Sequence, residues 1–356
     1  MTIDFLREPD VSPDQFFSLV DEGMHGMIRF AAVHAAGVLG LFDQLEGRGC
    51  TVLDLASLLG IDERSLSPLL SILCEIDLVS GEGEVYTNTP LASVFLVSAS
   101  PYCQKGHIHK NAVFLEKIWA ALPERLVHGP LVFDREVFFS DLSLPAMAEN
   151  ALTGRLQRTV REVIAMPEFA TAKRLLDLGG GHGLYAIAFA AVNPGLTAYV
   201  FDLPHVTPLA RTMIRNYHAS RVSPISGNFF TDDIGTGYDI IFSSSNPGGK
   251  SPALLTRIAG ALNSGGLFVN VQSDDAKSAD PYHELEWQLW TLGSTGKGTG
   301  RYTREQPFMT REYRDALRAA GFEVVRERQI RDDYHRESTV HLVIAKKVAK
   351  DKAVPG

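Results

Sequence analysis

A glycine-rich turn near the middle of the chain constrains the fold most strongly. Residues 175–178 read Leu-Leu-Asp-Leu, the next five residues read Gly-Gly-Gly-His-Gly, and an apolar helical stretch follows at 184–192. Glycines at such a turn let a ligand approach the backbone closely, with the amides and the N-terminus of the next helix facing it. The pattern predicts a buried strand, a ligand-binding turn and a helix.

The chain after residue 173 alternates short apolar runs with helical stretches. Strands are expected at 174–178, 197–201, 222–226, 238–243, 267–271, 322–329 and 339–346. Strands that alternate with helices imply right-handed βαβ units and a mostly parallel sheet. The last two runs follow one another closely and are expected to pair as an antiparallel edge. The predicted fold class is α/β, with a Rossmann-like domain in the second half of the chain.

The first half of the chain has an almost wholly helical pattern. Residues 27–45 are apolar nearly all round, which indicates a helix buried between other elements or between subunits. A helix at 51–59, a turn and a second helix follow, and the sequence SGEGEVYTNTP then suits a small β-wing. The apolar face of the second helix consists of Leu66, Leu69, Leu70 and Leu73. This order is that of a winged helix, so we divide the chain into a helical winged-helix domain at 1–165 and a ligand-binding domain at 166–350.

The charge of this winged helix argues against nucleic acid as a partner. The chain has 42 acidic and 34 basic side chains, a formal charge of −8. Around the helix that would enter a DNA groove, a single Arg64 faces four acids, which are Asp62, Glu63, Glu75 and Asp77. Such a helix would repel the phosphates on which groove binding depends. The domain is therefore expected to serve as a scaffold or for dimerisation.

Other features predict a cytoplasmic protein without a membrane segment. The first ten residues are charged rather than apolar, and the longest apolar runs are far shorter than the about 20 residues of a membrane span. The three cysteines, Cys50, Cys74 and Cys103, form no CxxC pair. Neither a disulfide framework nor a zinc site built from thiolates is indicated.

Two acids beside the glycine turn help to distinguish between nucleotide ligands. Asp202 ends the second strand, where its carboxylate can accept hydrogen bonds from both hydroxyls of a ribose. Asp177 stands just before the turn, where it would repel a pyrophosphate but suit a ligand with a cationic amino group. The dinucleotide fingerprint GxGxxG is not met, because Leu184 and Tyr185 follow the turn. These features favour S-adenosylmethionine (SAM) over NAD.

Several segments of the chain, taken together, resemble those of one protein family. They read LLDLGGGHG, YVFDLPHV, RVSPISGNFF, GYDIIFSSS, ALNSGGLFVNV and AGFEVV, preceded by IWAALPERLVHGP and AMAENALTG. Together they resemble the SAM-dependent small-molecule O-methyltransferases of the plant caffeate and bacterial antibiotic-tailoring type, including that family's dimerisation domain. The resemblance implies a class I methyltransferase domain, SAM as the cofactor, a small-molecule acceptor and a homodimer with intertwined N-terminal helices.

The resemblance also implies which residues contact SAM. By position they are Gly179, Gly181 and Gly183 beside the methionine part, with Asp177 before them, Asp202 at the ribose, Leu203, Asn228 and Phe229 at the adenine, and Ser243 at the end of the fourth strand. The family usually has an acid where this chain has Asn228. The side-chain oxygen of asparagine keeps a hydrogen-bond acceptor at that place.

The segment after the fourth strand departs from the family. Members usually read Leu-His-Asp-Trp there, and that histidine deprotonates the acceptor hydroxyl. This chain reads Ser-Ser-Ser-Asn-Pro-Gly-Gly-Lys at 243–250, and GTGRYTREQ replaces the acid that usually precedes an Arg-Thr pair in a later loop. Base assistance contributes about 10²–10⁴-fold to the rate. An acceptor that is already nucleophilic, or a relocated base, is therefore expected.

The candidates for a relocated catalytic group lie on other segments. His283 and Glu286 share one face of a helix expected to line the acceptor pocket, and Tyr302 lies on the loop that follows. His107 and His109 alternate in the earlier segment GHIHK. The spacing of these histidines fits no standard metal-ligand motif, so no metal site is predicted.

Three functions are compatible with this sequence. The preferred one is a SAM-dependent methyltransferase that acts on the oxygen or a ring carbon of a small aromatic metabolite. An aromatic pocket for that acceptor is available from Trp119, Trp287, Trp290, Phe138 and Phe139. The alternatives are a SAM-binding enzyme of the same fold with another reaction, such as hydroxylation or decarboxylation, and a winged-helix regulator that senses SAM. The acidic second helix disfavours the regulator.

Overall fold

The computed structural model describes residues 8–273, 280–292, 308–332 and 338–348. By its internal contacts the chain divides into two compact units, residues 1–112 and residues 113–356. The packing therefore groups residues 113–165 with the sheet, whereas the sequence division assigned them to the helical domain. A functional boundary at residue 165 stays a prediction. No helix in the described ranges has the length and apolar character needed to cross a membrane.

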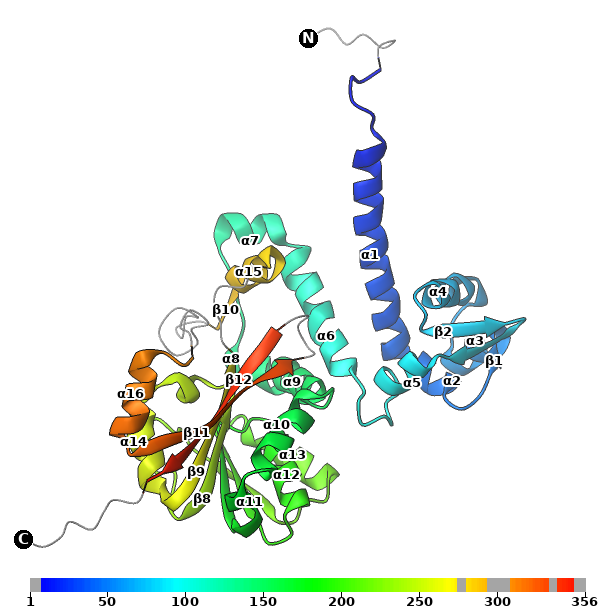
Figure 1. Cartoon of the computed structure of the whole chain (residues 1–356). Coiled ribbons are helices and arrows are strands. Elements are labelled where there is room, and N and C mark those ends of the chain that lie inside the picture. The colour runs from blue at the N-terminus through cyan, green and yellow to red at the C-terminus, as the bar shows by residue number, and fades with distance from the viewer. Residues whose placement is uncertain (1–7, 274–279, 293–307, 333–337, 349–356) are drawn as a thin grey trace, which may run out of the picture. The chain divides into compact units, whose positions relative to one another are not determined.

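The first unit is a helical domain with a small three-stranded sheet (Figure 1). Its elements are α1 (Asp14–Leu39), α2 (Leu41–Leu45), β1 (Cys50–Thr51), α3 (Val52–Leu59), α4 (Glu63–Glu75), β2 (Val79–Glu82), β3 (Val85–Asn88) and α5 (Pro90–Phe95), with α6 (Lys105–Phe114) at its end. The strand order is β1-β3-β2, so two helices and an antiparallel wing follow one another as expected for a winged helix. This part of the predicted fold class is confirmed.

Local sequence signals explain where these helices begin and end. The Thr51 hydroxyl accepts a hydrogen bond from the amide of Asp54, whose carboxylate accepts one from the Thr51 amide, so a capping box starts α3. The helix expected at 27–45 is divided in two, because Gly40 takes a left-handed conformation with φ 75° and ends α1. Leu41 and Phe42 are buried after this break, whereas Val38 is 70% exposed within the single chain.

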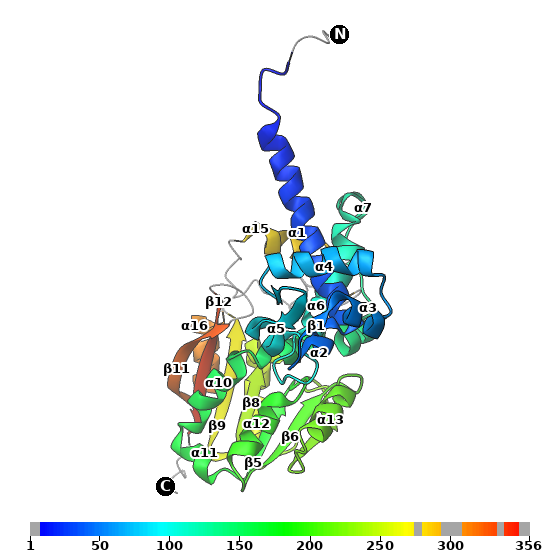
Figure 2. The same ribbon diagram turned by 90° about the vertical axis from the view of Figure 1, so that its right-hand side faces the viewer.

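The second unit carries a seven-stranded sheet with helices on both faces (Figures 1 and 2). Its strands are β5 (Arg174–Leu178), β6 (Thr197–Asp202), β7 (Val222–Ser226), β8 (Tyr238–Ser244), β9 (Leu262–Ser273), β11 (Phe322–Asp332) and β12 (Ser338–Lys347). Their order is β11-β12-β9-β8-β5-β6-β7. The pairs from β9 to β7 are parallel, and β12 is antiparallel to both of its neighbours. The predicted Rossmann-like sheet and its antiparallel edge are confirmed.

Alternating side chains along the strands build two separate cores. Leu175 and Phe242 belong to the core shared with α10 (Arg155–Ile164), α11 (Pro167–Thr171), α12 (Leu184–Val192) and α13 (Thr207–Asn216). Leu176 and Ile241 point to the opposite face, which α14 (Pro252–Ala261) and α16 (Arg311–Ala319) cover. This period of two is what a strand buried on both faces requires.

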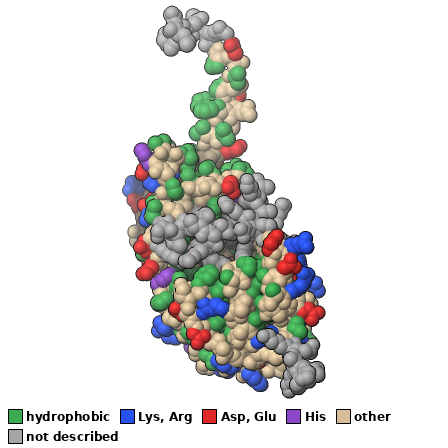
Figure 3. All heavy atoms as spheres, turned by 90° about the vertical axis from the view of Figure 1, so that its left-hand side faces the viewer, with side chains coloured by type: hydrophobic (Ala, Val, Ile, Leu, Met, Phe, Trp, Pro, Cys, Tyr) green, Lys and Arg blue, Asp and Glu red, His purple; other side chains and the backbone are tan. Residues whose placement is uncertain are grey.

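Helices and short strands that precede and follow these core elements complete the second unit. They are η1 (Leu115–Trp119), α7 (Leu122–His128), β4 (Leu131–Val132), α8 (Arg135–Val137), η2 (Phe138–Ser143), α9 (Leu144–Ala151), η3 (Pro247–Lys250), α15 (Pro281–Gln288) and β10 (Trp290–Thr291). The parallel pair of β4 and β10 joins two segments far apart in the chain. On the described part of the face in Figure 3, acidic and basic side chains of this unit are interspersed rather than gathered by sign.

Candidate active site

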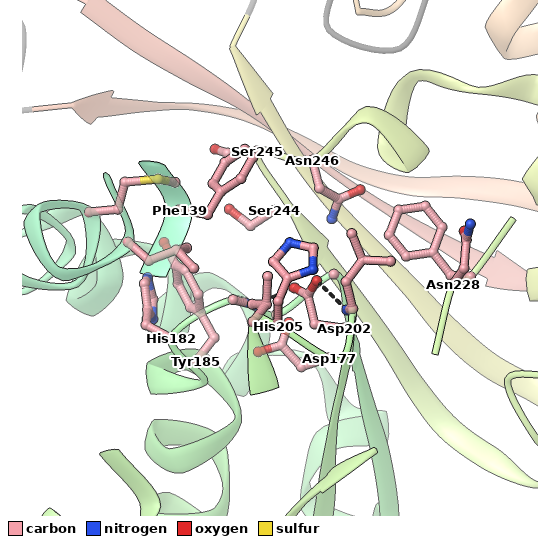
Figure 4. A pocket seen from close by; sticks show the side chains of 18 of the residues that line it. Phe139, Asp177, His182, Tyr185, Asp202, His205, Asn228, Ser244, Ser245 and Asn246 are labelled. Carbon is pink, nitrogen blue, oxygen red and sulfur yellow. Dashed lines mark hydrogen bonds between the residues drawn. The ribbon is translucent and has the colours of Figure 1, made fainter. Parts of the chain in front are cut away.

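A cavity opens at the carboxyl ends of β5, β6 and β8 (Figure 4). The chain runs outward from β5 to β6 and β7, then crosses back to β8 on the other side of β5. Ligands of open α/β sheets bind at such a switch point. The cavity is lined by Phe139, Leu144, Met147, Arg155, Asp177, Gly179, Gly180, Gly181, His182, Tyr185, Asp202, Leu203, His205, Val206, Asn228, Phe229, Phe230, Ser244, Ser245 and Asn246.

The glycine turn has the backbone that its sequence predicts. Gly179, Gly181 and Gly183 have φ values of 70°, 53° and 76°, a region that side-chain-bearing residues rarely adopt. A Cβ on Gly179 would also lie 2.8 Å from the Asn246 amide nitrogen. Gly179 and Gly181 line the cavity, and Gly183 is the residue from which α12 begins.

Asp202 is held at the end of β6 by the turn itself. Its carboxylate accepts hydrogen bonds from the backbone amides of Gly181, at 2.8 Å, and Leu203, at 2.7 Å. A carboxylate offers about four acceptor positions, so these bonds fix its orientation and leave capacity for a diol. The arrangement fits the role at a ribose that the sequence predicts for Asp202.

Asp177, the acid that precedes the same turn, is buried and has a raised pKa. The residue is 1% exposed, and its Oδ2 has no hydrogen-bond partner among the described residues. Burial, with a further contribution from the charge of Asp202, raises the pKa of this carboxyl from 3.8 to about 8. Asp177 is therefore protonated at neutral pH until a cation or a hydrogen-bond donor reaches it.

The adenine end of the predicted site is also assembled. Leu203, Asn228 and Phe229 all line the cavity. The Asn228 side-chain oxygen accepts a hydrogen bond from the Phe230 amide at 3.0 Å, which fixes the turn after β7. The rings of Phe229 and Phe230 lie 4.8 Å apart. Their roles toward a base stay predictions.

Arg155 is a cavity residue that the sequence analysis missed. It begins α10, and its Nη1 lies 3.1 Å from Oδ2 of Asp332, the last residue of β11. Burial lowers the pKa of Arg155, but its interactions with Tyr185 and Asp332 outweigh this and raise it. The guanidinium therefore stays charged within the cavity wall. No local pattern marks it, because it lies 22 residues before Asp177 on an ordinary amphipathic helix.

His182 is a neutral neighbour of this cation. It is 5% exposed, and its Nδ1 accepts a hydrogen bond from the Leu184 amide at 3.1 Å. Burial, and then the charge of Arg155, lowers the pKa of the imidazole to about 3. A neutral, buried imidazole suits a residue that shapes the site better than one that transfers a proton.

The turn after β8 presents hydroxyl and amide groups to the cavity. Ser244, Ser245 and Asn246 line it, and Ser245 has a left-handed φ of 51°, unusual for a residue with a side chain. The Ser244 Oγ is buried and has no hydrogen-bond partner among the described residues. This turn is where the family resemblance places a base, and it carries serines and an asparagine instead.

Asn246 connects this turn with the neighbouring strands. Its Nδ2 donates to the Leu178 carbonyl at 2.8 Å and to the Ser243 hydroxyl at 2.9 Å, while its Oδ1 accepts from the Gly249 amide at 3.1 Å. Ser243 is 1% exposed and is not among the residues that line the cavity. Its contact with a cofactor stays a prediction.

The predicted catalytic residues are not among those that line the cavity. His283 and Glu286 are half-buried on α15, and Tyr302 lies outside the described residues. Their catalytic roles stay predictions. His107, which belongs to the first unit, has a pKa lowered to about 4 by burial and by the charge of Lys110. Within the described residues, no group of three or more His, Cys, Asp or Glu side chains is arranged to hold a metal ion.

An aromatic cluster borders the cavity through Phe139. The Phe138 and Trp290 rings stack at 4.8 Å, and Phe139 meets Phe138 edge-on at 5.5 Å. Phe114 and Phe133 complete the cluster. The cluster combines η2, β10 and the segment before η1, so it depends on the pairing of β4 with β10. Of the five expected residues, Phe138, Phe139 and Trp290 belong to this cluster, Trp287 meets Trp290 edge-on at 5.6 Å and Trp119 packs against the same core. Of these five, only Phe139 lines the cavity.

Comparison with known proteins decides the family. Residues 128–323 match the O-methyltransferase domain, and residues 22–98 match the O-methyltransferase dimerisation domain. The chain belongs to the O-methyltransferase family. Members of this family use SAM, so the protein is a SAM-dependent methyltransferase with a dimerisation domain.

Individual proteins show how far the similarity extends. An uncharacterized protein of Methanocaldococcus jannaschii is 35% identical over 331 residues, which cover 90% of this chain and 88% of that protein. The N,N-dimethyltransferase OxyT of Streptomyces rimosus is 28% identical over 311 residues, 82% of this chain and 87% of OxyT. The solved O-methyltransferase family protein of Burkholderia thailandensis has a TM-score of 0.68 at 24% identity and covers 96% of this chain and 100% of its own.

Proposed function

We propose that this O-methyltransferase family member transfers the methyl group of SAM to a small, planar aromatic metabolite. The acceptor atom is an oxygen or ring carbon that needs no base from the turn after β8. The observation that carries the proposal is the contact between Phe139, part of the aromatic cluster, and the cavity that holds Asp177 and Asp202. An aromatic wall beside a nucleotide-type site suits a flat acceptor next to the cofactor.

The charges around the cavity support SAM as the molecule bound there. Asp202 suits the ribose, and Leu203 and Phe229 suit the flat adenine. Arg155 offers a positive charge for the carboxylate of the methionine part, and Asp177 offers a negative charge for the ammonium group once it has released its proton. Oδ2 of Asp177, which has no hydrogen-bond partner in the described part of the chain, is a buried atom that a ligand ammonium would satisfy. When bound, SAM supplies a methyl group on a positively charged sulfur, which is an electrophile.

The side chains of this chain then act by positioning and by excluding water. In-line displacement requires the acceptor atom to be held close to the methyl group, and such positioning accounts for much of the rate in reactions of this kind. Ser244 and Ser245 can orient an acceptor through their hydroxyls, which donate and accept hydrogen bonds without being strong bases. This chemistry favours acceptors such as an acidic phenol or an electron-rich ring carbon.

The test of this proposal has two stages. Calorimetry compares the binding of SAM and NAD, and a preference for NAD would contradict the cofactor assignment. The protein is then incubated with methyl-labelled SAM and fractions of aromatic metabolites, and label is sought in the products. We expect transfer to a planar acceptor. In a series of phenols, the rate should be higher for those that are ionised to a larger fraction at the pH of the assay.

The serine-containing turn after β8 also supports a second candidate. A SAM-binding enzyme of this fold could use the same cavity for decarboxylation, in which the carboxyl group leaves as CO₂ and a proton takes its place, or for hydroxylation, which would need dioxygen and an external reductant. Neither reaction transfers the methyl group of SAM. The labelling experiment separates the two candidate functions. Tight binding of SAM with no transfer of label to any acceptor, together with conversion of the acceptor, would favour this alternative.

We further propose that the protein works as a homodimer. The dimerisation domain supports this, and so does the exposed apolar surface of the first unit. Five large apolar residues of α1 are 46–69% exposed, namely Phe16, Phe17, Leu19, Val20 and Met24. Exposed apolar surface of this extent usually marks an interface. Light scattering should give twice the chain mass of 39.0 kDa, and a monomer would contradict the proposal.

A further inference from the structure

A buried ion pair connects the cavity to the far end of the chain. The side chains of Arg155 and Asp332 are 14% and 10% exposed, and Nη1 of Arg155 lies 3.1 Å from Oδ2 of Asp332. Arg155 lines the cavity, whereas Asp332 does not. The pair therefore consists of one residue that can touch a ligand and one that can act only through its partner.

Neighbouring contacts between α10 and β11 hold this ion pair in place. A second arginine of α10, Arg158, donates a hydrogen bond from its Nη2 to the Arg331 carbonyl at 3.1 Å. One turn further along, Arg326 of β11 lies 3.2 Å from the Glu162 carboxylate. These contacts join α10 to the end of β11, so Asp332 approaches Arg155 from a strand that is tied to the same helix.

The charge inside the cavity gives Arg155 a particular importance. It is the one lysine or arginine among the described residues that line the cavity. His182 is kept neutral beside it. A buried guanidinium without a counterion is costly, and Asp332 supplies that counterion from outside the cavity wall. The bond to Asp332 is made by Nη1, and a guanidinium has five N–H donors in all.

We propose that Asp332 is a positioning residue for the cofactor. It holds the Arg155 guanidinium at the cavity wall so that its other N–H groups bind the carboxylate of the methionine part of SAM. This inference rests on the proposed function, because it needs SAM in this cavity. It assigns a part in cofactor binding to β11, a strand that contributes no residue to the cavity lining.

The experiment compares two ligands that differ only in the carboxylate. The affinities of the full-length wild type and of Asp332→Ala are measured by calorimetry for SAM and for decarboxylated SAM. A charge-assisted hydrogen bond contributes about 1.5–3 kcal/mol, so Asp332→Ala should weaken SAM binding about 10- to 100-fold. The affinity for decarboxylated SAM should stay the same. Asp332→Asn keeps one acceptor oxygen and should show a smaller loss of the same kind.

A matched control comes from another ion pair between α10 and β11. Glu162→Gln breaks the neighbouring pair with Arg326 but removes no contact of Arg155, so its affinities for both ligands should equal those of the wild type. An equal loss for both ligands in Asp332→Ala and Asp332→Asn would overturn the inference, because it would indicate a general structural role. Unchanged or tighter binding of SAM would also overturn it.

The same measurements keep this inference separate from the proposed function. A wild type that binds neither ligand would refute SAM binding itself, and the role of Asp332 with it. A wild type that binds SAM, with an Asp332→Ala variant that shows no selective loss for SAM, would refute only the role of Asp332.

Discussion

The buried acid Asp177 allows a quantitative prediction about stability and pH. Its pKa rises from 3.8 to about 8 in the folded chain, chiefly because the group is buried. Between these two values the folded protein holds a proton that the unfolded chain has released. The free energy of unfolding contributed by this group therefore falls by about 1.4 kcal/mol per pH unit as the pH rises.

Replacing Asp177 by asparagine removes this titration and keeps the size of the side chain. The free energy of unfolding of Asp177→Asn minus that of the wild type should increase by about 3 kcal/mol from pH 5 to pH 7. Each of the two pH units contributes about 1.4 kcal/mol to this change. Urea unfolding at several pH values measures the difference. Tryptophan fluorescence is a suitable signal, since Trp119, Trp287 and Trp290 all belong to the second unit.

Asp239 provides the control for this experiment. Burial opposes ionisation there, but the hydrogen bonds from the Lys173 and Arg174 amides outweigh it and lower the pKa of the carboxyl. Both the folded and the unfolded states are ionised at pH 5–7, so the effect of Asp239→Asn should not vary with pH in this window. A stability difference between Asp177→Asn and the wild type that is equally constant would refute the assignment of a protonated Asp177.

Three further predictions concern the cavity and the segment after β8. Binding of SAM at pH 7 should release a proton from Asp177, so the calorimetric enthalpy should depend on the ionisation enthalpy of the buffer, and Asp177→Asn should abolish this dependence. Gly249→Ala should lower stability by about 1–3 kcal/mol in thermal unfolding, because its Cβ would lie 1.8 Å from Nε2 of Gln272. Phe139→Ala should raise the KM of an aromatic acceptor severalfold and leave the affinity for SAM unchanged; a change in SAM affinity alone would contradict the aromatic wall.

The strands were predictable where the sequence pattern alone determines them. The run at 174–178 coincides with β5, because three of its five residues are leucines that are buried on the two faces of the sheet. β9 begins at Leu262, five residues before the predicted start, although Gly265 and Gly266 indicate a turn. Pairing of Leu262 with Tyr238 on β8 extends the strand, and a register shift between Tyr238 and Ile240 accommodates the irregularity. Tertiary pairing of this kind leaves no local signal.

In the candidate site, too, some residues were predictable from the sequence and others were not. Asp177, Asp202 and the glycines were predictable, because one strand-turn-helix unit and the next strand bring them together within a short stretch of chain. Arg155 was not, because its place depends on Asp332, 177 residues further along the sequence. His283 and Glu286 were selected from the family resemblance, and the cavity lining consists of other residues.

The position of β12 has a consequence for synthesis of the protein. Among the described strands this one comes last in sequence, yet it lies inside the sheet between β9 and β11. Until Lys347 has left the ribosome, β9 keeps an open edge and β11 has no strand to pair with. A nascent chain arrested before Ser338 should therefore expose unpaired backbone, bind chaperones and be sensitive to proteases. The sheet is therefore completed by a strand that is synthesised after both of its neighbours.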